Sequence, residues 1–214
     1  GQACQSLERV YVARSIYPEF IKALINEAER VELNAKDIRH GHLGPIIMEA
    51  QATIIAGQVD AAVEAGAKKL TGGTVENHNG GLWIRPTVLV DVTHDMDIIK
   101  EETFGPVLPV IAFDTPEQAI AFANDSDFGL SAAVFGEEAE ATAVGVQINA
   151  GAISINDGGL TAIAFEAEKD SYGLSGLGRS RMGTSGLKRF LRKKAILTRH
   201  AGGAGIDSLR EHRD

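Results

Sequence analysis

Apolar residues in the first third of the chain repeat with the spacing of helices. Between Pro18 and Ala35 they recur three and four positions apart, on one helical face, at Phe20, Ile21, Leu24, Ile25, Ala28 and Val31. A second long helix is expected from about Ile46 to Ala65, with Gly66 in the position of a C-terminal glycine cap. The stretch from Glu8 to Ala13, ERVYVA, is typical of a short strand.

Two further strands and a helix are predicted in the middle of the chain. The strands span about Thr87 to Val92 and Val107 to Phe113. The helix that follows them has a clear start and runs to about Asn124, because Thr115 suits the N-cap and Pro116 the first helical position.

The segments beyond residue 130 continue the alternation. LSAAVFG is typical of a strand, EEAEATAVGVQINAG of a helix with Gly151 beyond its end, and AISIN of another strand. Strands that alternate with helices of this length predict an α/β fold, with a parallel-type sheet flanked by helices.

A glycine-rich stretch, GLSGLGRSRMG, extends from Gly173 to Gly183. It contains no GxxxxGK[ST] motif, and the residues after Gly176-Leu177-Gly178 do not complete GxGxxG. These residues therefore do not predict a nucleotide-binding fold within the chain.

Composition narrows the class of protein. The chain has 214 residues, 44% of them hydrophobic, which is enough for one or two globular units. Its apolar runs are far shorter than the roughly 20 residues of a membrane span, so no membrane association is expected. A single cysteine cannot form an internal disulfide, which favours a reducing compartment, and we expect a cytoplasmic protein.

That single cysteine, Cys4, stands in the small-residue stretch GQAC just before the first expected strand. Most free cysteines are buried and inert, so position alone is weak support for a nucleophile. A turn of small residues nevertheless lets backbone amides approach the sulfur and lets a carbonyl reach it. None of the six histidines lies near Cys4 in sequence, so a Cys/His hydrolase has no support there.

A second candidate segment is KEETFGPV, residues 100–107. It could be a solvated acidic turn that leads into a strand. Alternatively, Glu102 and Phe104 lie two residues apart and so face the same side of an extended segment. A carboxylate can accept hydrogen bonds from two sugar hydroxyls and a ring can back a flat heterocycle, which together suit a ribose-linked cofactor.

Taken together, these segments resemble a known family. GQAC and its strand are followed by GPII, by PTVLVDVTHDMDIIKEETFGPVLPVIAFDTPEQAIAFANDSDFGLSAAVFG, by AGAISIN and by SGLGR. In this order they resemble the aldehyde dehydrogenase superfamily from Gly1 to about Gly183. The resemblance implies an NAD(P)-dependent enzyme that oxidises an aldehyde to a carboxylic acid through a thiohemiacetal and a thioester.

The resemblance also implies roles for individual residues. Cys4 matches the nucleophile, and its neighbours Ala3 and Gln5 would line the substrate pocket. Glu102 matches the residue that holds the nicotinamide ribose, and Phe104 matches the aromatic residue packed near the ring.

Asn156, which closes AISIN, matches the asparagine at the start of a loop that lines the aldehyde pocket. No metal site is implied. Where many members have Pro-Phe-Gly-Gly, this chain has a different sequence from Phe165 to Gly176, so no pocket residues are assigned from 165 to 172.

In this family the Rossmann-type cofactor domain lies before the nucleophile, as do the water-activating Glu and the oxyanion-hole Asn. NAD or NADP would therefore be bound mainly outside this chain, which we expect to lack turnover by itself. Residues 1–186 would form the aldehyde dehydrogenase-like catalytic domain, and residues 187–214 an interface strand and flexible tail. Two alternatives are a non-catalytic interaction module that keeps the fold and a Cys-dependent esterase.

Positive charge gathers near the C-terminus. Residues 179–199 contain eight Lys or Arg and no acidic residue, although the net charge of the whole chain is -8. A solvated face, the interface strand of a homodimer or homotetramer, and a nucleic-acid contact are all compatible with this pattern. Nucleic acid is disfavoured because no aromatic platform interleaves the basic residues.

Overall fold

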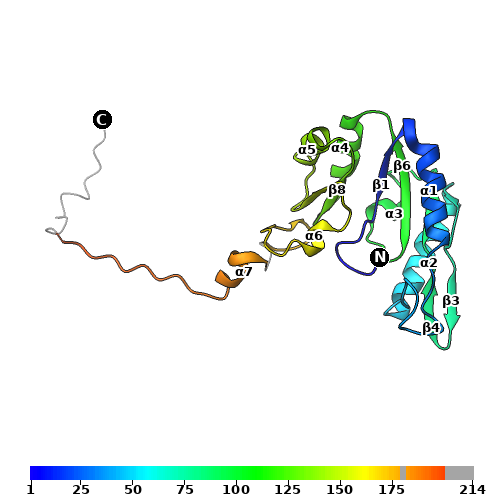
Figure 1. Cartoon of the computed structure of the whole chain (residues 1–214), viewed down its shortest axis with the longest axis horizontal. Coiled ribbons are helices and arrows are strands. Elements are labelled where there is room, and N and C mark those ends of the chain that lie inside the picture. The colour runs from blue at the N-terminus through cyan, green and yellow to red at the C-terminus, as the bar shows by residue number, and fades with distance from the viewer. Residues whose placement is uncertain (179–181, 201–214) are drawn as a thin grey trace.

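The computed structural model describes residues 1–178 and 182–200. Its larger part is built on a four-stranded sheet with the order β1-β6-β5-β2. The neighbouring strands β1 and β6 are labelled in Figure 1. The strands are β1 (Val10–Ala13), β2 (Lys68–Lys69), β5 (Thr87–Val90) and β6 (Val107–Phe113). β1 and β5 run parallel to β6, while β2 adds an antiparallel edge. The predicted α/β class with parallel strands is confirmed.

The parallel pairing of β1 with β6 determines where the two candidate segments lie. Val10 pairs with Val110, so the two strands start at the same end of the sheet. The Cys4 stretch leads into β1, and the segment that contains Glu102 and Phe104 leads into β6. Both segments therefore lie at the same end of the sheet, where β1 and β6 begin.

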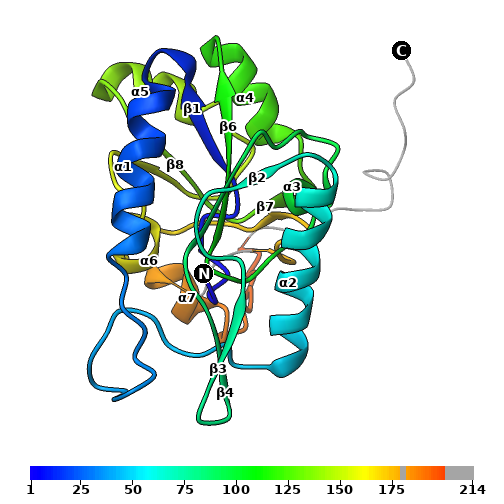
Figure 2. The ribbon, with the colours of Figure 1, turned by 90° about the vertical axis from the view of Figure 1, so that its right-hand side faces the viewer.

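Helices cover both faces of this sheet, as parallel sheets require. The 3-10 helix η1 (Arg14–Ile16) leads into α1 (Tyr17–Glu29) on one face, and α2 (Glu49–Glu64) and α3 (Asp97–Lys100) pack on the other (Figure 2). β5 shows the alternation of a strand buried on both sides. Val88 and Val90 join the core cluster beneath α1, whereas Leu89 packs with Ile55 and Val59 of α2.

A β-hairpin extends from the end of the sheet (Figure 2). It consists of β3 (Val75–His78) and β4 (Gly81–Ile84), which pair antiparallel. The two turn residues, Asn79 and Gly80, have φ of 55° and 87°. Positive φ at both central residues is the requirement of a type I′ hairpin turn, which Asn-Gly satisfies.

A smaller part follows β6 along the chain. It contains α4 (Pro116–Asn124), β7 (Phe128–Gly129), β8 (Ala132–Val134), α5 (Glu138–Gly145), β9 (Ile153–Ile155), α6 (Leu160–Ile163), β10 (Tyr172–Gly173) and α7 (Gly183–Lys188). β8 and β9 are parallel, and β7 pairs with β10 antiparallel. α7 lies at the far end of this part, away from the four-stranded sheet (Figure 1).

Several predictions from the sequence are confirmed. β6 has the predicted bounds, and α4 begins at Pro116 and ends at Asn124. Thr115 is its N-cap, since its Oγ1 accepts a hydrogen bond of 3.3 Å from the backbone amide of Gln118. Gly66 follows α2 with φ of 109°, the conformation expected of a C-terminal glycine.

Two helices are shorter than predicted. α1 ends at Glu29 rather than Ala35, because the next residues pair with a later loop: Leu33 forms a bridge with Leu43, and the Asn34 amide donates to the Leu43 carbonyl at 3.0 Å. α5 ends at Gly145, where Val-Gly-Val is a poor helix former.

The interface strand expected within residues 187–214 is not among the strands of the described residues, and its formation between subunits stays a prediction. α7 ends at Lys188, and residues 191–200 are exposed and without regular structure. A strand requires a neighbouring strand to satisfy its backbone groups, and none lies beside this segment in the described part of the chain. The tail from residue 201 to 214 lies outside the described residues. Within the described residues, no helix is long and apolar enough to cross a membrane.

Candidate active site

Cys4 lies in a tight turn before β1, at the end of the sheet where β1 and β6 begin. The backbone amide of Ser6 donates to the Ala3 carbonyl at 2.9 Å, which places Cys4 at the second position of the turn. The Cys4 thiol is free and its residue is exposed. Of its neighbours, Ala3 is exposed and Gln5 is half-buried. A thiol on an exposed turn is accessible to a small electrophile.

Gln2 anchors this turn to the loop before α2. Its Nε2 donates to the Pro45 carbonyl at 2.8 Å, and its Oε1 accepts from the Ile47 amide at 2.9 Å. Gly1 packs against the backbone of Gly105, where a Cβ on Gly1 would overlap the carbonyl. The two residues at the start of this segment are therefore held in place, Gln2 by the loop before α2 and Gly1 by the backbone of Gly105.

Glu8 joins the cysteine turn to the segment that contains Glu102 and Phe104. Its Oε1 accepts a hydrogen bond of 2.8 Å from the Ser6 hydroxyl. Its Oε2 accepts one of 2.9 Å from the Thr103 backbone amide, 95 residues away in sequence. The structure thus brings together the two segments that sequence analysis singled out.

Residues 102–104 alternate between solvent and protein. Glu102 is exposed, Thr103 is 1% exposed and Phe104 is half-buried. The alternation agrees with the prediction that Glu102 and Phe104 share one side, but Phe104 has a φ of 47°, so the segment is not a regular strand. A positive φ in a bulky residue is strained and persists only where surrounding contacts impose it.

α2 supplies those contacts. Gln51 Nε2 donates to the Thr103 carbonyl at 2.7 Å, and Gln58 Nε2 donates to the Glu102 carbonyl at 3.4 Å. Partial burial, and then the negative charge of Glu8, raise the pKa of the Glu102 carboxyl above its ordinary value. The backbone of the segment is held firmly while its two candidate side chains remain available.

These two side chains fit a ribose-linked cofactor. Within the described residues, no hydrogen bond or ion pair engages the Glu102 carboxylate, whose oxygens can accept from sugar hydroxyls. The Phe104 ring is partly accessible to a flat heterocycle. The described residues contain no group of three or more His, Cys, Asp or Glu that could hold a metal ion.

Asn156 follows β9 and lies on the other part of the molecule. Its Oδ1 accepts from the Gly136 amide at 2.8 Å and its Nδ2 donates to the Gly136 carbonyl at 2.9 Å. The loop after it reaches the cysteine segment, because a Cβ on Gly158 would lie 3.8 Å from Leu7 Cδ1. The Asn156 amide therefore shapes this loop, and a contact with substrate stays a prediction.

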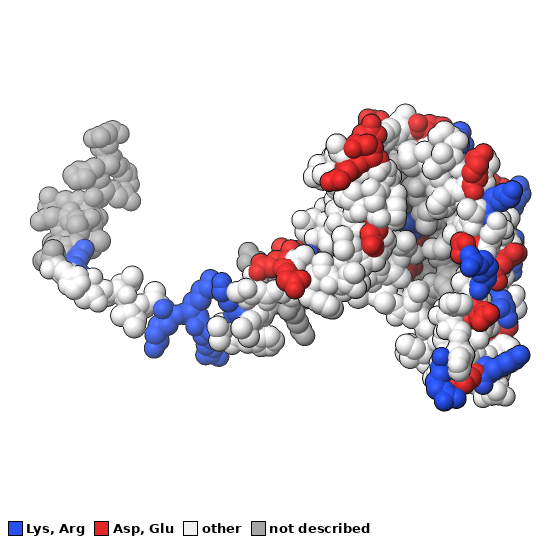
Figure 3. All heavy atoms as spheres, viewed as in Figure 1, with Lys and Arg blue, Asp and Glu red and all other residues white. Residues whose placement is uncertain are grey.

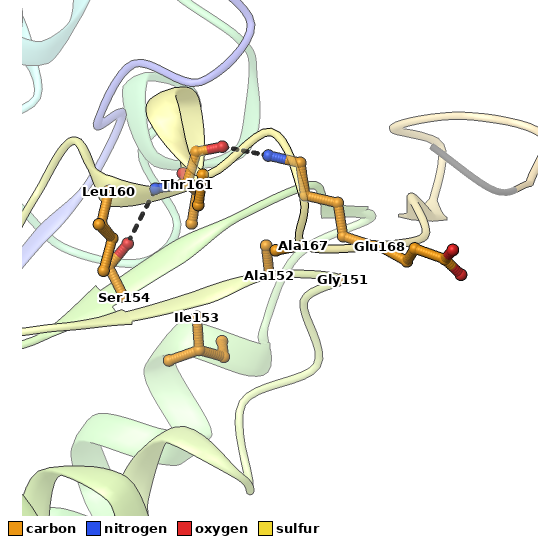
Figure 4. A pocket seen from close by; sticks show the side chains of 10 residues that line it. Gly151, Ala152, Ile153, Ser154, Leu160, Thr161, Ala167 and Glu168 are labelled. Atoms are coloured by element: carbon orange, nitrogen blue, oxygen red, sulfur yellow. Dashed lines mark hydrogen bonds between the residues drawn. The ribbon is translucent and has the colours of Figure 1, made fainter. Parts of the chain in front are cut away.

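A pocket of about 240 Å³ lies beside β9. It is lined by residues of β9 and of the following segment: Gly151, Ala152, Ile153, Ser154, Leu160, Thr161, Ala164, Ala167, Glu168 and Lys169 (Figure 4). The Thr161 amide donates to Ser154 Oγ at 3.3 Å, and Lys169 Nζ donates to the Thr161 carbonyl. Neither Cys4 nor Glu102 lines this pocket, so it is separate from the candidate site.

The sequence alone predicts no role at this site for Gln2, Glu8, Gln51 or Gln58. Each acts through hydrogen bonds to the backbone of a segment about 40 to 95 residues away, and local spacing does not record such partners. The only available signal is that Glu8 is an acidic residue two positions before the hydrophobic strand β1.

The chain is similar to proteins of one family along most of its length. Residues 1–196 match the sequence profile of the Aldehyde dehydrogenase family. A 3,6-anhydro-alpha-L-galactose dehydrogenase of Streptomyces coelicolor is 34% identical over 206 residues, which are 94% of this chain and 41% of that protein.

Solved structures show the same similarity. PutA of Anabaena variabilis is 50% identical, with a TM-score of 0.91 over 96% of this chain and 44% of PutA. A betaine aldehyde dehydrogenase of Staphylococcus aureus, solved in complex with NAD+, is 31% identical, with a TM-score of 0.81 over 95% of this chain and 41% of that chain. The chain thus spans less than half of the length of these relatives.

Proposed function

The chain belongs to the aldehyde dehydrogenase family, and on that premise we propose that it supplies the nucleophile of an NAD(P)-dependent enzyme that oxidises an aldehyde to a carboxylic acid. The observation that supports this most directly is the Glu8 bridge. Through it, an exposed thiol on a tight turn lies beside a segment with an available carboxylate and ring. A thiol nucleophile and a cofactor must meet at one place for the chemistry to occur.

The chemistry begins with Cys4. Its thiolate attacks the aldehyde carbon, the C=O double bond becomes a C–O⁻ single bond, and a thiohemiacetal forms. The backbone amide of Cys4 donates to this oxyanion, and one such donor contributes roughly 3 kcal/mol to lowering the barrier. When bound, a nicotinamide cofactor would supply the acceptor for the hydride, whose loss from this carbon converts the thiohemiacetal into a thioester. Water then cleaves the thioester on Cys4 and releases the carboxylic acid.

Glu102 and Phe104 would hold the nicotinamide end of the cofactor. The Glu102 carboxylate would accept hydrogen bonds from the ribose hydroxyls, and the Phe104 ring would pack near the nicotinamide. A related mycobacterial semialdehyde dehydrogenase has NADP+ in its name, and the Staphylococcus enzyme was solved with NAD+. We propose NAD or NADP, bound mainly by residues outside these 214, together with the group that activates water.

Aldehyde-dependent NAD(P)H formation tests the proposal. The complete open reading frame that encodes this chain is expressed, and absorbance is followed with a panel of aldehydes and both cofactors. We expect turnover that is lost in Cys4→Ser and retained in Glu64→Ala, a matched change at an exposed residue of α2. In the same Cys4→Ser variant, alkylation by iodoacetamide should be lost from the peptide that contains residue 4.

The outcome also discriminates between the alternatives. No NAD(P)H with any aldehyde would overturn the proposal. If the wild-type thiol then reacts no faster than free cysteine at neutral pH, a non-catalytic interaction module remains. If p-nitrophenyl acetate is cleaved without cofactor, and cleavage is lost in Cys4→Ser, a Cys-dependent esterase remains.

We also propose that the active protein is a homodimer or homotetramer. Basic side chains lie on the exposed segment after α7, while acidic side chains gather over α5 (Figure 3). Charge complementarity of this kind favours association with a second copy, in which residues 187–200 could gain a neighbouring strand. Light scattering after size-exclusion chromatography should give a mass that is a multiple of the monomer and falls when residues 187–214 are removed.

A further inference from the structure

We propose that Glu8 is a positioning residue, which sets the affinity for the cofactor by fixing the Cys4 turn against residues 102–104 without itself touching the cofactor. This inference rests on the proposed function for its kinetic consequence. The hydrogen bonds of Glu8 to Ser6 and Thr103 can be tested without enzymatic activity.

Glu8 is suited to this role because both of its oxygens are engaged. Each accepts one hydrogen bond, at 2.8 Å from the Ser6 hydroxyl and at 2.9 Å from the Thr103 amide. Hydrogen bonds to an ionised carboxylate are stronger than those between neutral groups. Ser6 Oγ also lies 3.2 Å from the Gly1 carbonyl, but its single proton favours the shorter contact to Glu8. The carboxylate therefore fastens the turn and the segment to each other.

Thr103 is the residue that Glu8 holds. Its N–H donates to Glu8, and its carbonyl, which belongs to the next peptide unit, accepts from Gln51 on α2 at 2.7 Å, so the backbone is held on both sides of the Thr103 Cα. Thr103 is 1% exposed, which leaves no water to replace a lost partner. Glu102 and Phe104 directly precede and follow Thr103 in the chain, so a shift of the Thr103 backbone would displace both residues.

Glu8 has no other hydrogen-bond partner among the described residues, so its carboxylate is used entirely in this bridge. The negative charge also acts on the neighbouring segment, since it contributes to the raised pKa of Glu102. A glutamine at this position would keep one acceptor for the Thr103 amide and one group able to donate to Ser6 Oγ. An alanine would keep neither.

The geometric part is tested by hydrogen–deuterium exchange of the peptide that covers residues 101–106. Wild type and Glu8→Gln should protect the Thr103 amide, whereas in Glu8→Ala its exchange should accelerate about tenfold or more. Glu64→Ala is the control and should exchange as wild type does. Equal protection in Glu8→Ala and wild type would overturn the proposal, whether or not the protein oxidises aldehydes.

The kinetic part uses the complete open reading frame at a temperature where circular dichroism shows every variant folded. Glu8→Ala should raise the KM for the cofactor about tenfold, with a smaller effect on the KM for the aldehyde, and Glu8→Gln should recover most of this loss. With every variant folded, a merely structural role would leave both KM values unchanged, and that result would overturn the proposal. Absence of turnover in the wild type would instead overturn the proposed function, while the exchange result would still decide the role of Glu8.

Discussion

The side-chain amide of Asn156 exchanges two hydrogen bonds with the backbone of Gly136, at 2.8 and 2.9 Å. The pair joins the residue after β9 to the second residue after β8, and so closes the open end of a two-stranded parallel sheet. Asn156 has a φ of 56°, a left-handed conformation that asparagine tolerates better than most residues. This contact directs the loop at residues 157–159 back toward the cysteine segment.

Replacing Asn156 should therefore destabilise the smaller part of the molecule. Asn156→Ala loses both hydrogen bonds and leaves an alanine in a left-handed conformation, for a total cost of about 2 kcal/mol in the free energy of unfolding. Asn156→Gly loses the same bonds without the backbone strain, so it should cost less. Urea unfolding followed by circular dichroism measures both variants. Equal stability of Asn156→Ala and wild type would show that the contact contributes nothing.

Glu102→Gln should stabilise the fold while it weakens cofactor binding. The raised pKa of Glu102 means that the native state holds its proton to higher pH than the unfolded state. Stability contributed by this group is therefore lost as the pH rises from the ordinary carboxylate range, about 4.3, through the folded-state pKa. Glutamine does not titrate and avoids that loss.

Urea unfolding curves measured across pH test whether the stability contributed by Glu102 is lost as the pH rises. Glu102→Gln should be more stable than wild type at neutral pH, and the difference should disappear below the ordinary carboxylate range. A gain that persists in acid would have a cause other than titration. In the active protein the same variant should raise the KM for the cofactor, because an amide accepts fewer hydrogen bonds from a ribose than a carboxylate does.

Two substitutions of Phe104 should distinguish the effect of its strained backbone conformation on stability from the effect of its ring on cofactor binding. Glycine adopts the observed φ of 47° without strain, whereas alanine does not. Phe104→Gly should thus be more stable than Phe104→Ala by about 1 kcal/mol, although both lose the packing of the ring. If the ring contacts the cofactor, both variants should raise its KM to a similar extent. Thermal unfolding and steady-state kinetics on the same preparations provide the two readouts.

Gly105 and Ile55 should be energetically coupled. A Cβ on Gly105 would lie 2.6 Å from Ile55 Cδ1, and Ile55 is fully buried on α2. Gly105→Ala should therefore destabilise the protein by about 1 to 3 kcal/mol through overpacking. Ile55→Val removes the atom closest to the new Cβ, so the double variant should lose less stability than the two single variants together. Strict additivity in a double-mutant cycle would contradict this contact.

Helix and strand boundaries were predicted correctly where they depend on residues close together in the sequence. The N-cap at Thr115, the strand from Val107 to Phe113 and the glycine after α2 all depend on residues within a few positions of one another. α1 was predicted too long, because a pairing between residues 33–34 and 43 competes with helix continuation. The interface strand expected within residues 187–214 stays a prediction, because no strand of the described part of the chain lies beside residues 191–200.

For the candidate site, the sequence by itself determined which chemical groups are present: one thiol, one acidic and aromatic segment, and an order of motifs that resembles a family. It could not determine that the Cys4 turn and residues 102–104 are joined through Glu8, because the proximity of these segments follows from the parallel pairing of β1 with β6. Only the tertiary structure assigned Glu8, Gln2 and the α2 glutamines to this site. The physical reason is that their partners are backbone groups, which every residue possesses, so no side-chain pattern along the chain marks them.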